Sequence, residues 1–383
     1  MTYICSIVMN DLKNDNRVLN QAISLSKVGY HVTIFAAQRI SKLQNEEFKG
    51  ITINRINLNN SFIKKIWILR YLYLQFQVFK VTVFYCKSLN DSNKIVHCHD
   101  LKSLHFGVLI KIFYYYNTKL IYDAHEYETQ KNGLNIFTKI YNKLKEKLLI
   151  RYIDSLITVS NTIAEEYSRL YNIPKPTVIL NCPVIDPESE IVRHDIFREK
   201  FNISDSTKIF LYQGYFSVGR GIEIILEAFN ELNFKDIALV FMGEGAMIKE
   251  IKSNELYENS VYIHPFVASD EIIKHTSSAD YGISFIEDIS LSDRYCLPNK
   301  LFEYIAAGLP VITSGLPEME KFVKIHGVGV SSNENSVSGF VEAFGELINM
   351  DREALNKNIN KTRKKYNWST QEKILLDLYE NLN

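Results

Sequence analysis

Residues 297–312, LPNKLFEYIAAGLPVI, begin with polar side chains that could bind a phosphate and a sugar. Pro298 suits the first position of a helix, and the free backbone amides of that helix would form an anion site. Lys300 would add a positive charge to this site. Glu303, on the same helical face, could accept hydrogen bonds from sugar hydroxyls. The alternative is a plain ion pair between Lys300 and Glu303, which would stabilise the helix by roughly a few tenths of a kcal/mol.

Glycines and one arginine follow two apolar runs further upstream. YQGYFSVGRG (212–221) places Gly214 where a ligand can approach the backbone closely, and Arg220 where its planar fork can hold two phosphate oxygens. FMGEG (241–245) repeats the transition from an apolar run to glycine. These residue types indicate a phosphate site, unless the glycines serve tight turns only.

Histidines and carboxylates end two further apolar runs, KIVHCHD and LIYDAHE. Their polar members are His97, His99, Asp100, Asp123, His125 and Glu126. Because open parallel sheets bind ligands beyond the carboxyl ends of their strands, both clusters should face one crevice. His125 is the best candidate for contacting a substrate hydroxyl or a developing charge. Helix capping within a solvated loop is the alternative for each cluster.

The spacing of these residues supports neither a metal site nor a dinucleotide site. The H-x-H-D run lacks the spacing of familiar zinc or hydrolase motifs, and no dense third set of ligands accompanies it. No metal and no other cofactor is therefore expected. The first strand-to-helix turn, MNDLKNDNRV, lacks G-x-G-x-x-G. Asn10 and Asp11 leave the first strand there and could meet an acceptor, whereas Asp15 or Asn16 would cap the next helix.

Strand-like and helix-like segments alternate along the chain and would position these residues. A first series of short, β-rich runs occupies 3–9, 31–37, 94–98, 119–124 and 155–160. A second series, after the polar stretch 182–195, occupies 208–214, 237–243, 260–266, 280–286 and 309–314. Such alternation predicts two α/β domains, each a doubly wound parallel sheet with helices on both faces. Helices are expected over 221–232, 270–279 and 366–382.

The composition fits two domains of similar size. The chain has 383 residues, of which 46% are hydrophobic and 23% charged, enough for two cores. Five scattered cysteines without a C-x-x-C pair fit a reducing cytosol and argue against a disulfide framework. We find no secretion signal, and no stretch has the roughly 18 uncharged apolar residues that a membrane span needs.

The charges are distributed unevenly although the net charge is zero. Residues 1–182 hold 24 basic and 13 acidic side chains, and residues 183–383 hold 20 and 31. The basic half indicates an anionic partner, either nucleic acid or a membrane surface. No nucleic-acid-binding module is recognisable, so we do not expect nucleic acid. The basic, aromatic stretches 62–87 and 136–152 could rest on an anionic membrane face, with solvated helix faces as the alternative.

Taken in order, these motifs resemble the retaining, nucleotide-sugar-dependent glycosyltransferases of family four, the group 1 glycosyl transferases. The segments that carry the resemblance are DNRVLNQAISLSKVGYHVTIF, HCHD, YDAHE, GYFSVGRGIEIILEAF, MGEG and LPNKLFEYIAAGLPVIT. The last segment, with its PNKLFEY motif, is the most specific and resembles a subgroup that builds bacterial surface polysaccharides. The resemblance implies the GT-B fold, in which two Rossmann-like domains face each other across a cleft. It divides the chain into an acceptor domain 1–185, a nucleotide-sugar domain 186–365 and a helix 366–383 that crosses back.

The functional residues of the family can be carried over position by position. A basic pair of the family grips the donor pyrophosphate, and here Arg220 is its second member while Tyr215 stands at the first position. Of two family glutamates, the one that holds the ribose matches Glu303, and Tyr295 occupies the position of the other. The expected catalytic residues are His125, Arg220, Lys300 and Glu303. The expected donor-binding residues are Gly214, Tyr215, Arg220, Gly243, Glu244, Phe266, Tyr295, Asn299, Lys300, Leu301 and Glu303. The expected acceptor-side residues are Asn10, Asp11, His99, Asp100 and Glu126.

The resemblance implies metal-independent transfer of a sugar, with retention of configuration, from a nucleotide-diphosphate donor, with a UDP-sugar favoured. The acceptor would be a polysaccharide or a lipid-linked glycan. The expected location is the cytoplasm, with peripheral contact at the inner face of the membrane. Two alternatives stay open: a sugar-nucleotide 2-epimerase of the same fold, and a non-catalytic partner subunit of a glycosyltransferase, which the loss of a glutamate at Tyr295 would suit.

Overall fold

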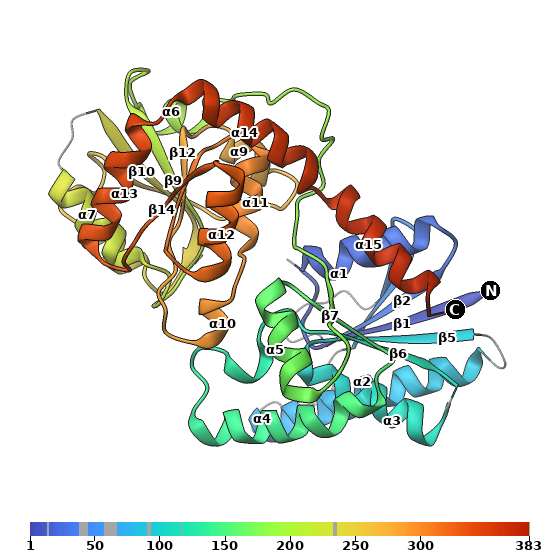
Figure 1. Ribbon diagram of the computed structural model, residues 1–383. Helices are drawn as coiled ribbons and strands as arrows, with labels where there is room; N and C mark the ends of the chain where they lie inside the picture. The colour runs from blue at the N-terminus through green and yellow to red at the C-terminus, as the bar shows by residue number, and fades with distance from the viewer. Residues whose placement is uncertain are drawn as a thin grey trace. The chain divides into compact units, whose positions relative to one another are not determined.

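The computed structural model describes residues 1–13, 15–37, 45–56, 67–89, 93–115, 117–232 and 236–382, with only the backbone described for 67–71. The chain divides into two compact units (Figure 1). Unit 1 comprises Met1–Ile179 and Glu372–Asn383, and unit 2 comprises Leu180–Gln371. The sequence placed the divisions after residues 185 and 365, whereas the chain passes from one unit to the other after Ile179 and again after Gln371.

Unit 1 is built on an eight-stranded sheet in the order β3-β4-β2-β1-β5-β6-β7-β8. Neighbouring strands are parallel except β3 and β4, which are antiparallel. The strands are β1 (Thr2–Val8), β2 (His31–Ala37), β3 (Asn45–Phe48), β4 (Ile51–Ile56), β5 (Asn93–His99), β6 (Lys119–Asp123), β7 (Ser155–Thr158) and β8 (Thr177–Val178). The inner strands are apolar along almost their whole length because helices cover both of their faces.

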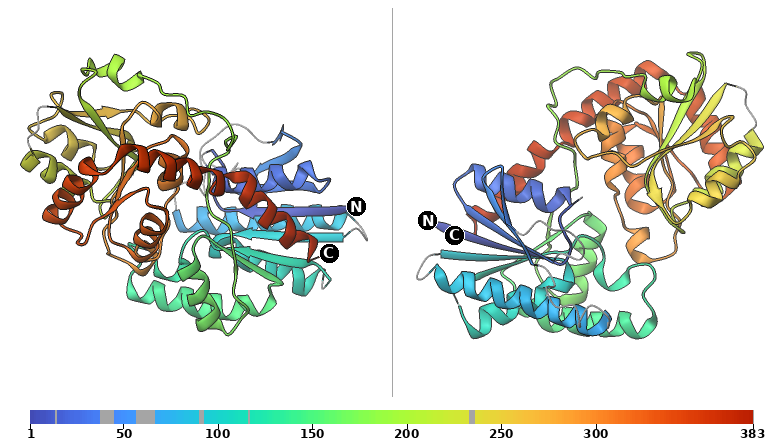
Figure 2. Two further views of the ribbon diagram at one scale, coloured as in Figure 1. Left: turned by 45° about the horizontal axis from the view of Figure 1, so that its top comes forward. Right: turned by 180° about the vertical axis from the view of Figure 1, so that it is seen from behind.

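The helices of unit 1 lie in two layers. One face of the sheet carries α1 (Asn16–Lys27) and the end of α15 (Trp368–Glu380) (Figures 1 and 2). The other face carries α2 (Trp67–Ser88), α3 (Asp100–Phe113) and α4 (Ile136–Leu149), and α5 (Asn161–Tyr171) leads from β7 to β8. Of the two candidates for capping α1, Asp15 is the cap, because its side chain accepts a hydrogen bond from the amide of Val18.

Unit 2 is built on a six-stranded parallel sheet in the order β11-β10-β9-β12-β13-β14. The strands are β9 (Lys208–Phe216), β10 (Ile237–Gly245), β11 (Val261–His264), β12 (Tyr281–Ser284), β13 (Val311–Thr313) and β14 (Gly329–Ser331). Side chains alternate between two apolar cores along each strand: Phe210 and Tyr212 belong to one core, and Ile209 and Leu211 to the other. The prediction of two doubly wound parallel sheets is confirmed.

The helices of unit 2 also cover both faces of their sheet. The first core is closed by α7 (Ile222–Leu232) and α13 (Val337–Asn349). The second is closed by α9 (Ile272–Thr276), α11 (Asn299–Ala306), α12 (Pro317–His326) and α14 (Arg352–Lys365). Unit 2 also contains the short helices α6 (Ile196–Phe201), α8 (Ile248–Ser253) and α10 (Leu291–Arg294).

Two expectations about helices need correction. α11 begins at Asn299, because Pro298 has an extended ψ of 148° and is the residue before the helix rather than its first member. The helix expected over 270–279 is shorter, since α9 ends at Thr276. Just after that end, the hydroxyls of Ser277 and Ser278 donate to the carbonyl of Lys274. None of the helices among the described residues is both long and apolar enough to cross a bilayer. Residues 62–66 of the basic, aromatic stretch 62–87 lie outside the described part.

Candidate functional site

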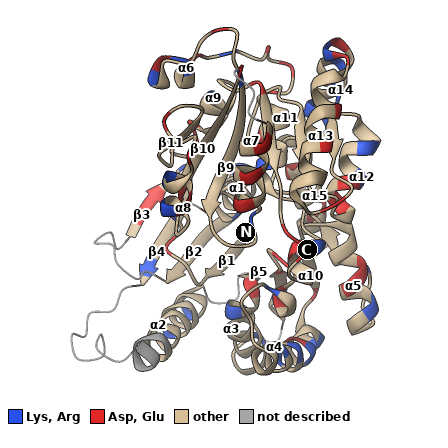
Figure 3. Ribbon diagram, turned by 90° about the vertical axis from the view of Figure 1, so that its left-hand side faces the viewer, with Lys and Arg blue, Asp and Glu red and all other residues tan. Residues whose placement is uncertain are grey.

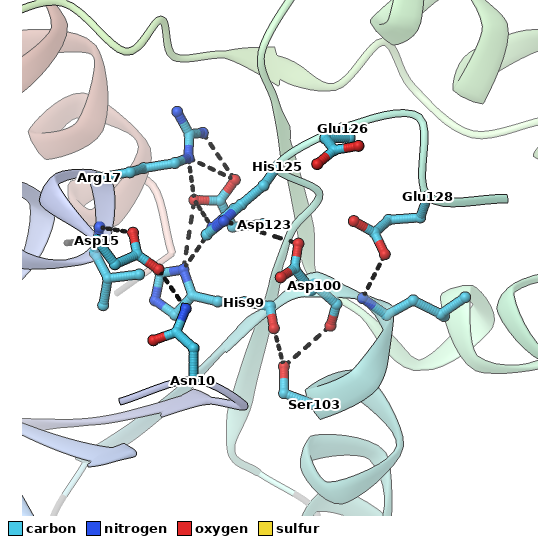
Figure 4. Close-up of polar contacts among 12 residues, drawn as sticks. Asn10, Asp15, Arg17, His99, Asp100, Ser103, Asp123, His125, Glu126 and Glu128 are labelled. Atoms are coloured by element: carbon cyan, nitrogen blue, oxygen red, sulfur yellow. Dashed lines mark hydrogen bonds and ion pairs between the residues drawn. The ribbon is translucent and has the colours of Figure 1, made fainter. Parts of the chain in front are cut away.

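In unit 1, the buried carboxylate of Asp123 at the end of β6 is the centre of a polar cluster (Figure 4). Arg17 of α1 donates to both carboxylate oxygens, with Nη2 2.8 Å from Oδ1 and Nε 2.9 Å from Oδ2. Gln21 donates to Oδ2 at 2.8 Å. Arg17 and Gln21 are four residues apart, so one face of α1 binds the carboxylate. Arg17 also donates to the carbonyl of Ile179 at 2.7 Å.

Three imidazoles surround the same carboxylate. Oδ2 of Asp123 lies 3.6 Å from Nδ1 of His99, 3.6 Å from Nε2 of His125 and 3.9 Å from Nε2 of His97. His99 bridges two partners, with Nε2 2.9 Å from Oγ of Ser6 and Nδ1 3.1 Å from Nε2 of His125. The tautomers of His99 and His125 are therefore linked, because a proton on Nδ1 of His99 makes Nε2 of His125 an acceptor.

Burial and charge fix the protonation of this cluster. Burial opposes the ionised form of Asp123, but Arg17 and His125 outweigh it and hold the pKa of the carboxyl well below its usual range. Burial lowers the pKa of His97 and of His99, so both rings are neutral at pH 7. One ionised carboxylate is thus paired with one guanidinium and lies beside the two neutral imidazoles of His97 and His99.

A second polar group lies at the start of α3, around Asp100. This residue has a φ of 64°, in the left-handed region, which costs a non-glycine residue about 1–3 kcal/mol. Its Oδ1 lies 3.7 Å from Nδ1 of His125 and 3.9 Å from Nζ of Lys131. Burial acts against ionisation, but His125 and Lys131 outweigh it and lower the pKa of Asp100 to about 2. His125 is therefore flanked by an ionised carboxylate at Nδ1 and by His99 at Nε2.

The structure corrects the role expected for His99. Its side chain is only 1% exposed, so it orients His125 and does not reach an acceptor. Asp100 and Glu126 do reach the surface, with side chains 27% and 55% exposed.

Asn10 and Asp11, two further residues expected on the acceptor side, are engaged in the loop before α1. The amide nitrogen of Asn10 donates to Asp15 at 2.8 Å, and its oxygen accepts from the amide of Leu12 at 2.9 Å. Asp11 accepts from the amide of Lys13 at 3.2 Å. These bonds shape the loop and hold the cap of α1, and the acceptor role of Asn10 and Asp11 stays a prediction.

Three potential metal ligands also meet in the described part of unit 1. His97, His99 and Asp123 bring ligand atoms within 4.8 Å of one another. His97 bonds through Nδ1 to the hydroxyl of Tyr379 at 2.8 Å, while its Nε2 has no hydrogen-bond partner among the described residues. The guanidinium of Arg17 on the same carboxylate repels a cation. The pairing of β5 with β6 brings the three residues together at one edge of the sheet, as expected from the sequence for the two clusters.

In unit 2, the ends of β9 and β10 approach so closely that only glycine fits. Gly243 pairs with Gly214, and a Cβ at Gly243 would lie 1.9 Å from the carbonyl oxygen of Gly214. A Cβ at Gly245 would lie 2.2 Å from the carbonyl oxygen of Phe216. Gly214 has a φ of 127°, and Nζ of Lys300 lies 3.8 Å from where its Cβ would be. The glycines therefore serve close strand packing and leave room beside Gly214 for an ammonium group.

Lys300 carries a buried ammonium group that has no hydrogen-bond partner among the described residues. Nζ lies 3.7 Å from the ring centroid of Tyr212, a cation–π contact. Burial and the nearby charge of Arg220 lower the pKa of Lys300 to about 7, against an opposite effect of Glu303. No ion pair joins Lys300 to Glu303 in the described part of the chain. The alternative that these two residues serve only to stabilise the helix is therefore not supported.

The carboxylate of Glu303 is held by a different partner, Gln213 at the end of β9. Nε2 of Gln213 donates to Glu303, and Oε1 of Gln213 accepts from the hydroxyl of Thr276 at 2.7 Å. Thr276 thereby fixes the orientation of the amide. The backbone amide of Gln213 donates to the hydroxyl of Tyr304 at 3.0 Å. Burial raises the pKa of Glu303, while Gln213 and Lys300 oppose this rise.

Arg220 faces a carboxylate that the sequence analysis did not identify. Its Nη1 lies 3.7 Å from Oδ1 of Asp293, and its side chain is 42% exposed. Ser290 donates to Oδ2 of Asp293 at 2.6 Å. Asp293 is buried and lies two residues before Tyr295, at which the family pattern loses its glutamate.

The remaining expected donor-binding residues fall into two groups. Those whose side chains reach the surface are Tyr215, Glu244, Phe266, Tyr295 and Asn299. Leu301, by contrast, is fully buried in the second core of unit 2, so its side chain packs the sheet and cannot contact a donor.

Arg17, Asp293 and Gln213 are among the residues of these clusters that were missed from the sequence. The apolar spacing around Arg17 predicts a helix, but no motif there indicates that Arg17 pairs with Asp123. Asp293 lies in a short helix whose position no apolar pattern indicates. Gln213 could have been found, because it is a polar residue at the end of a strand, directly before Gly214.

Two family comparisons together span nearly the whole chain. Residues 15–188 match the family described as Glycosyltransferase Family 4, and residues 194–365 match the family described as Glycosyl transferases group 1. The chain belongs to the group 1 glycosyltransferases. Among the relatives of this family member is a chitobiosyldiphosphodolichol beta-mannosyltransferase of Candida albicans, 23% identical over 364 residues, which cover 87% of this chain and 77% of that protein.

Solved structures of other proteins share the fold of this group 1 glycosyltransferase. Sucrose-phosphate synthase from Thermosynechococcus elongatus superposes with a TM-score of 0.77 at 16% identity, covering 100% of this chain and 99% of that one. HepE from Anabaena, in complex with UDP and glucose, gives a TM-score of 0.73 at 14% identity, covering 99% and 98%. At such identities the likeness shows the fold alone, and it confirms the predicted GT-B class.

Proposed function

We propose that this group 1 glycosyltransferase moves a sugar from a nucleotide-diphosphate donor, with a UDP-sugar favoured, to a polysaccharide or lipid-linked glycan. The observation that carries the proposal is the buried ammonium of Lys300 beside Gly214. A buried charge without a partner is costly, and a diphosphate would compensate it. HepE is solved with UDP and glucose, and the name of the Candida relative gives a diphosphodolichol-linked acceptor, which supports the choice of substrates.

In this proposal the donor is bound by unit 2. Arg220 and Lys300 bind the diphosphate and take up the charge that develops as the nucleotide leaves. The free amides at the start of α11 add to this site. Glu303, oriented by Gln213, accepts hydrogen bonds from the ribose. The other residues assigned to the donor are Gly214, Tyr215, Gly243, Glu244, Phe266, Tyr295 and Asn299.

The acceptor side is assigned to unit 1. His125, held by His99 and Asp100, contacts the reacting sugar, and Asp100 and Glu126 accept hydrogen bonds from the acceptor. The bond between the anomeric carbon and the phosphate oxygen breaks, and the acceptor oxygen bonds to that carbon from the same face. The acceptor proton passes to the departing phosphate oxygen, and the configuration is retained. No metal ion and no covalent nucleophile takes part in this scheme.

A lipid-linked acceptor is found at a membrane, so the proposal includes peripheral contact with the inner membrane face from the cytoplasm. Unit 1 would make this contact. Its part of the sequence carries the excess of basic residues.

The test is to incubate the protein with a panel of nucleotide sugars, with and without lipid-linked acceptors, and to measure released nucleotide and epimerised donor. We expect acceptor-dependent release of UDP that EDTA does not abolish, and a product whose anomeric coupling constant by NMR matches the donor configuration. Epimer without released nucleotide would identify the epimerase alternative. Donor binding without turnover on any acceptor would identify a non-catalytic partner. Either result would overturn the proposal.

A further inference from the structure

Helix α4 of unit 1 presents a continuous apolar face to solvent. Its members are Ile136, Phe137, Ile140, Tyr141, Leu144 and Leu148, with exposures of 63%, 81%, 52%, 64%, 59% and 59%. Spacings of three and four residues place them on one side of the helix, and we call this set the α4 apolar face. Single exposed apolar residues are ordinary, but six on one helix mark an interaction surface.

The charges of α4 are almost all positive. The helix contains Lys139, Lys143, Lys145 and Lys147 and one acidic residue, Glu146. Glu146 is fully buried, so it does not neutralise the outer side. Lys143 and Lys147 are exposed and border the α4 apolar face. Basic segments of α4 appear in blue in Figure 3.

Glu146 determines which side of α4 is turned outward. Three tyrosines donate their hydroxyls to its carboxylate: Tyr122 of β6 at 2.6 Å, and Tyr167 and Tyr171 of α5 at 2.9 and 2.6 Å. Burial raises the pKa of Glu146, and the three hydroxyls oppose this rise. Turning the helix to hide its apolar face would break all three bonds and leave buried polar groups unpaired. The fold therefore holds the apolar face toward solvent.

We propose that the α4 apolar face inserts into the headgroup region of an anionic lipid leaflet, with Lys143 and Lys147 on the lipid phosphates. A helix of this kind lies in the membrane plane and binds through buried apolar area together with attraction to anionic lipid. The inference rests on the proposed function, in which a lipid-linked acceptor places the reaction at a membrane. The positive charge along α4 complements an anionic leaflet, whereas a second copy of the chain would bring like charges together. Helix α2, in the same layer, adds Phe76 and Phe84, which are 58% and 74% exposed.

The test is flotation of the full chain with vesicles of phosphatidylcholine alone, or of phosphatidylcholine mixed with phosphatidylglycerol. Two double variants probe α4: Phe137→Ser with Leu144→Ser, and Lys143→Glu with Lys147→Glu. Matched controls on unit 2 are Ile325→Ser, which is 66% exposed on α12, and Lys357→Glu with Lys361→Glu, at the same spacing on α14. We expect the wild type and both controls to float with the anionic vesicles only. Each α4 variant should weaken vesicle binding by about tenfold or more.

Several results would overturn the inference. They are a wild type that does not float, equal flotation with both kinds of vesicle, and α4 variants that float like the wild type. A dimer in sedimentation equilibrium that the serine variant abolishes would assign the face to a second copy instead. Thermal unfolding should be unchanged in both α4 variants, because the substituted side chains are exposed.

Donor binding without vesicles separates this inference from the proposed function. If the α4 variants bind a UDP-sugar normally but do not float, the lipid role is supported on its own. If the wild type floats but binds no nucleotide sugar, the proposed function fails while the contact of α4 with lipid stands.

Discussion

In unit 1 the buried carboxylate of Asp123 accepts hydrogen bonds from Arg17 and Gln21. In unit 2, by contrast, the buried ammonium of Lys300 lies over the ring of Tyr212 and has no hydrogen-bond partner among the described residues. The carboxylate of Asp123 is paired within the protein, so it supports structure and holds the histidines around it in place. The ammonium of Lys300 is left unpaired, and its burial lowers the stability of the folded protein. This difference accords with the proposed function, in which the paired carboxylate positions other residues and the unpaired ammonium binds the donor.

The largest effect is expected from removing the partner of Asp123. Arg17→Ala should lower the free energy of unfolding by about 3–5 kcal/mol, because it leaves a buried carboxylate without its cation. Urea unfolding at pH 7 measures this, with Arg169→Ala as an exposed control. Since the pKa of Asp123 is held down in the folded protein, its stabilisation exists at neutral pH and is lost as the pH falls through that low value. The difference between variant and wild type should therefore shrink in acid, and an equal loss at all pH values would contradict the assignment.

Lys300→Met should show the opposite pattern. Removing a buried cation that lacks a partner should leave the melting temperature unchanged or raise it, because the desolvation cost disappears. Affinity for a UDP-sugar, measured by calorimetry, should fall by roughly 100-fold, or about 2.7 kcal/mol. Lys274→Met, at an exposed lysine of α9, is the control. A destabilised Lys300→Met that still binds donor like the wild type would show that the lysine is structural.

The pH dependence of donor binding should report the pKa of Lys300, which is about 7 in the free protein. A bound diphosphate favours the charged form, so affinity should decrease as the pH rises above 7, approaching tenfold per pH unit. An intact UDP-sugar is the suitable ligand because its diphosphate does not titrate there. In the absence of ligand, stability should rise with pH above 7, since the unfolded chain keeps the lysine proton up to its usual pKa. Both trends should vanish in Lys300→Met, and a flat affinity profile in the wild type would exclude Lys300 as a diphosphate ligand.

The smallest effect is expected from Thr276→Val, which removes the bond that orients the amide of Gln213. The amide can then turn its oxygen toward Glu303, which weakens the hold on the carboxylate. We expect a loss of about 1 kcal/mol, a few-fold in donor affinity, and a similar loss in stability. Isothermal titration with UDP and thermal unfolding measure the two quantities. Thr138→Val, at an exposed bond on α4, should leave both quantities nearly unchanged.

Local patterns in the sequence predict much of the fold. Apolar runs that alternate with helical segments indicate both doubly wound sheets, because apolar residues are spaced differently in strands and in helices. The transitions from apolar runs to glycine and the PNKLFEY motif likewise indicate that Gly214 lies near the end of a strand and that Lys300 and Glu303 lie on a short helix. What cannot be predicted in this way is which atoms these side chains meet.

The partners in the two clusters come from pairings that no local pattern encodes. Arg17 meets Asp123 because the first turn of α1 reaches the end of β6, at a separation of 106 residues. Gln213 meets Glu303 at a separation of 90 residues. The assignments of His99 and Leu301 to substrate contact failed for the same reason, since depth within a sheet depends on neighbours that are distant in the sequence. Burial of Lys300 likewise follows from packing against Tyr212 and not from its own segment.

Tyr379 of α15 bonds to His97 across 282 residues, and the whole of unit 2 lies between them in the chain. On the ribosome, β5 and its histidine emerge early, whereas Tyr379 emerges only after unit 2 has been made. Domains usually fold in the order of their synthesis. Here the first unit to be started is the last to be finished, because the nascent chain cannot complete the histidine cluster of unit 1 before translation reaches α15.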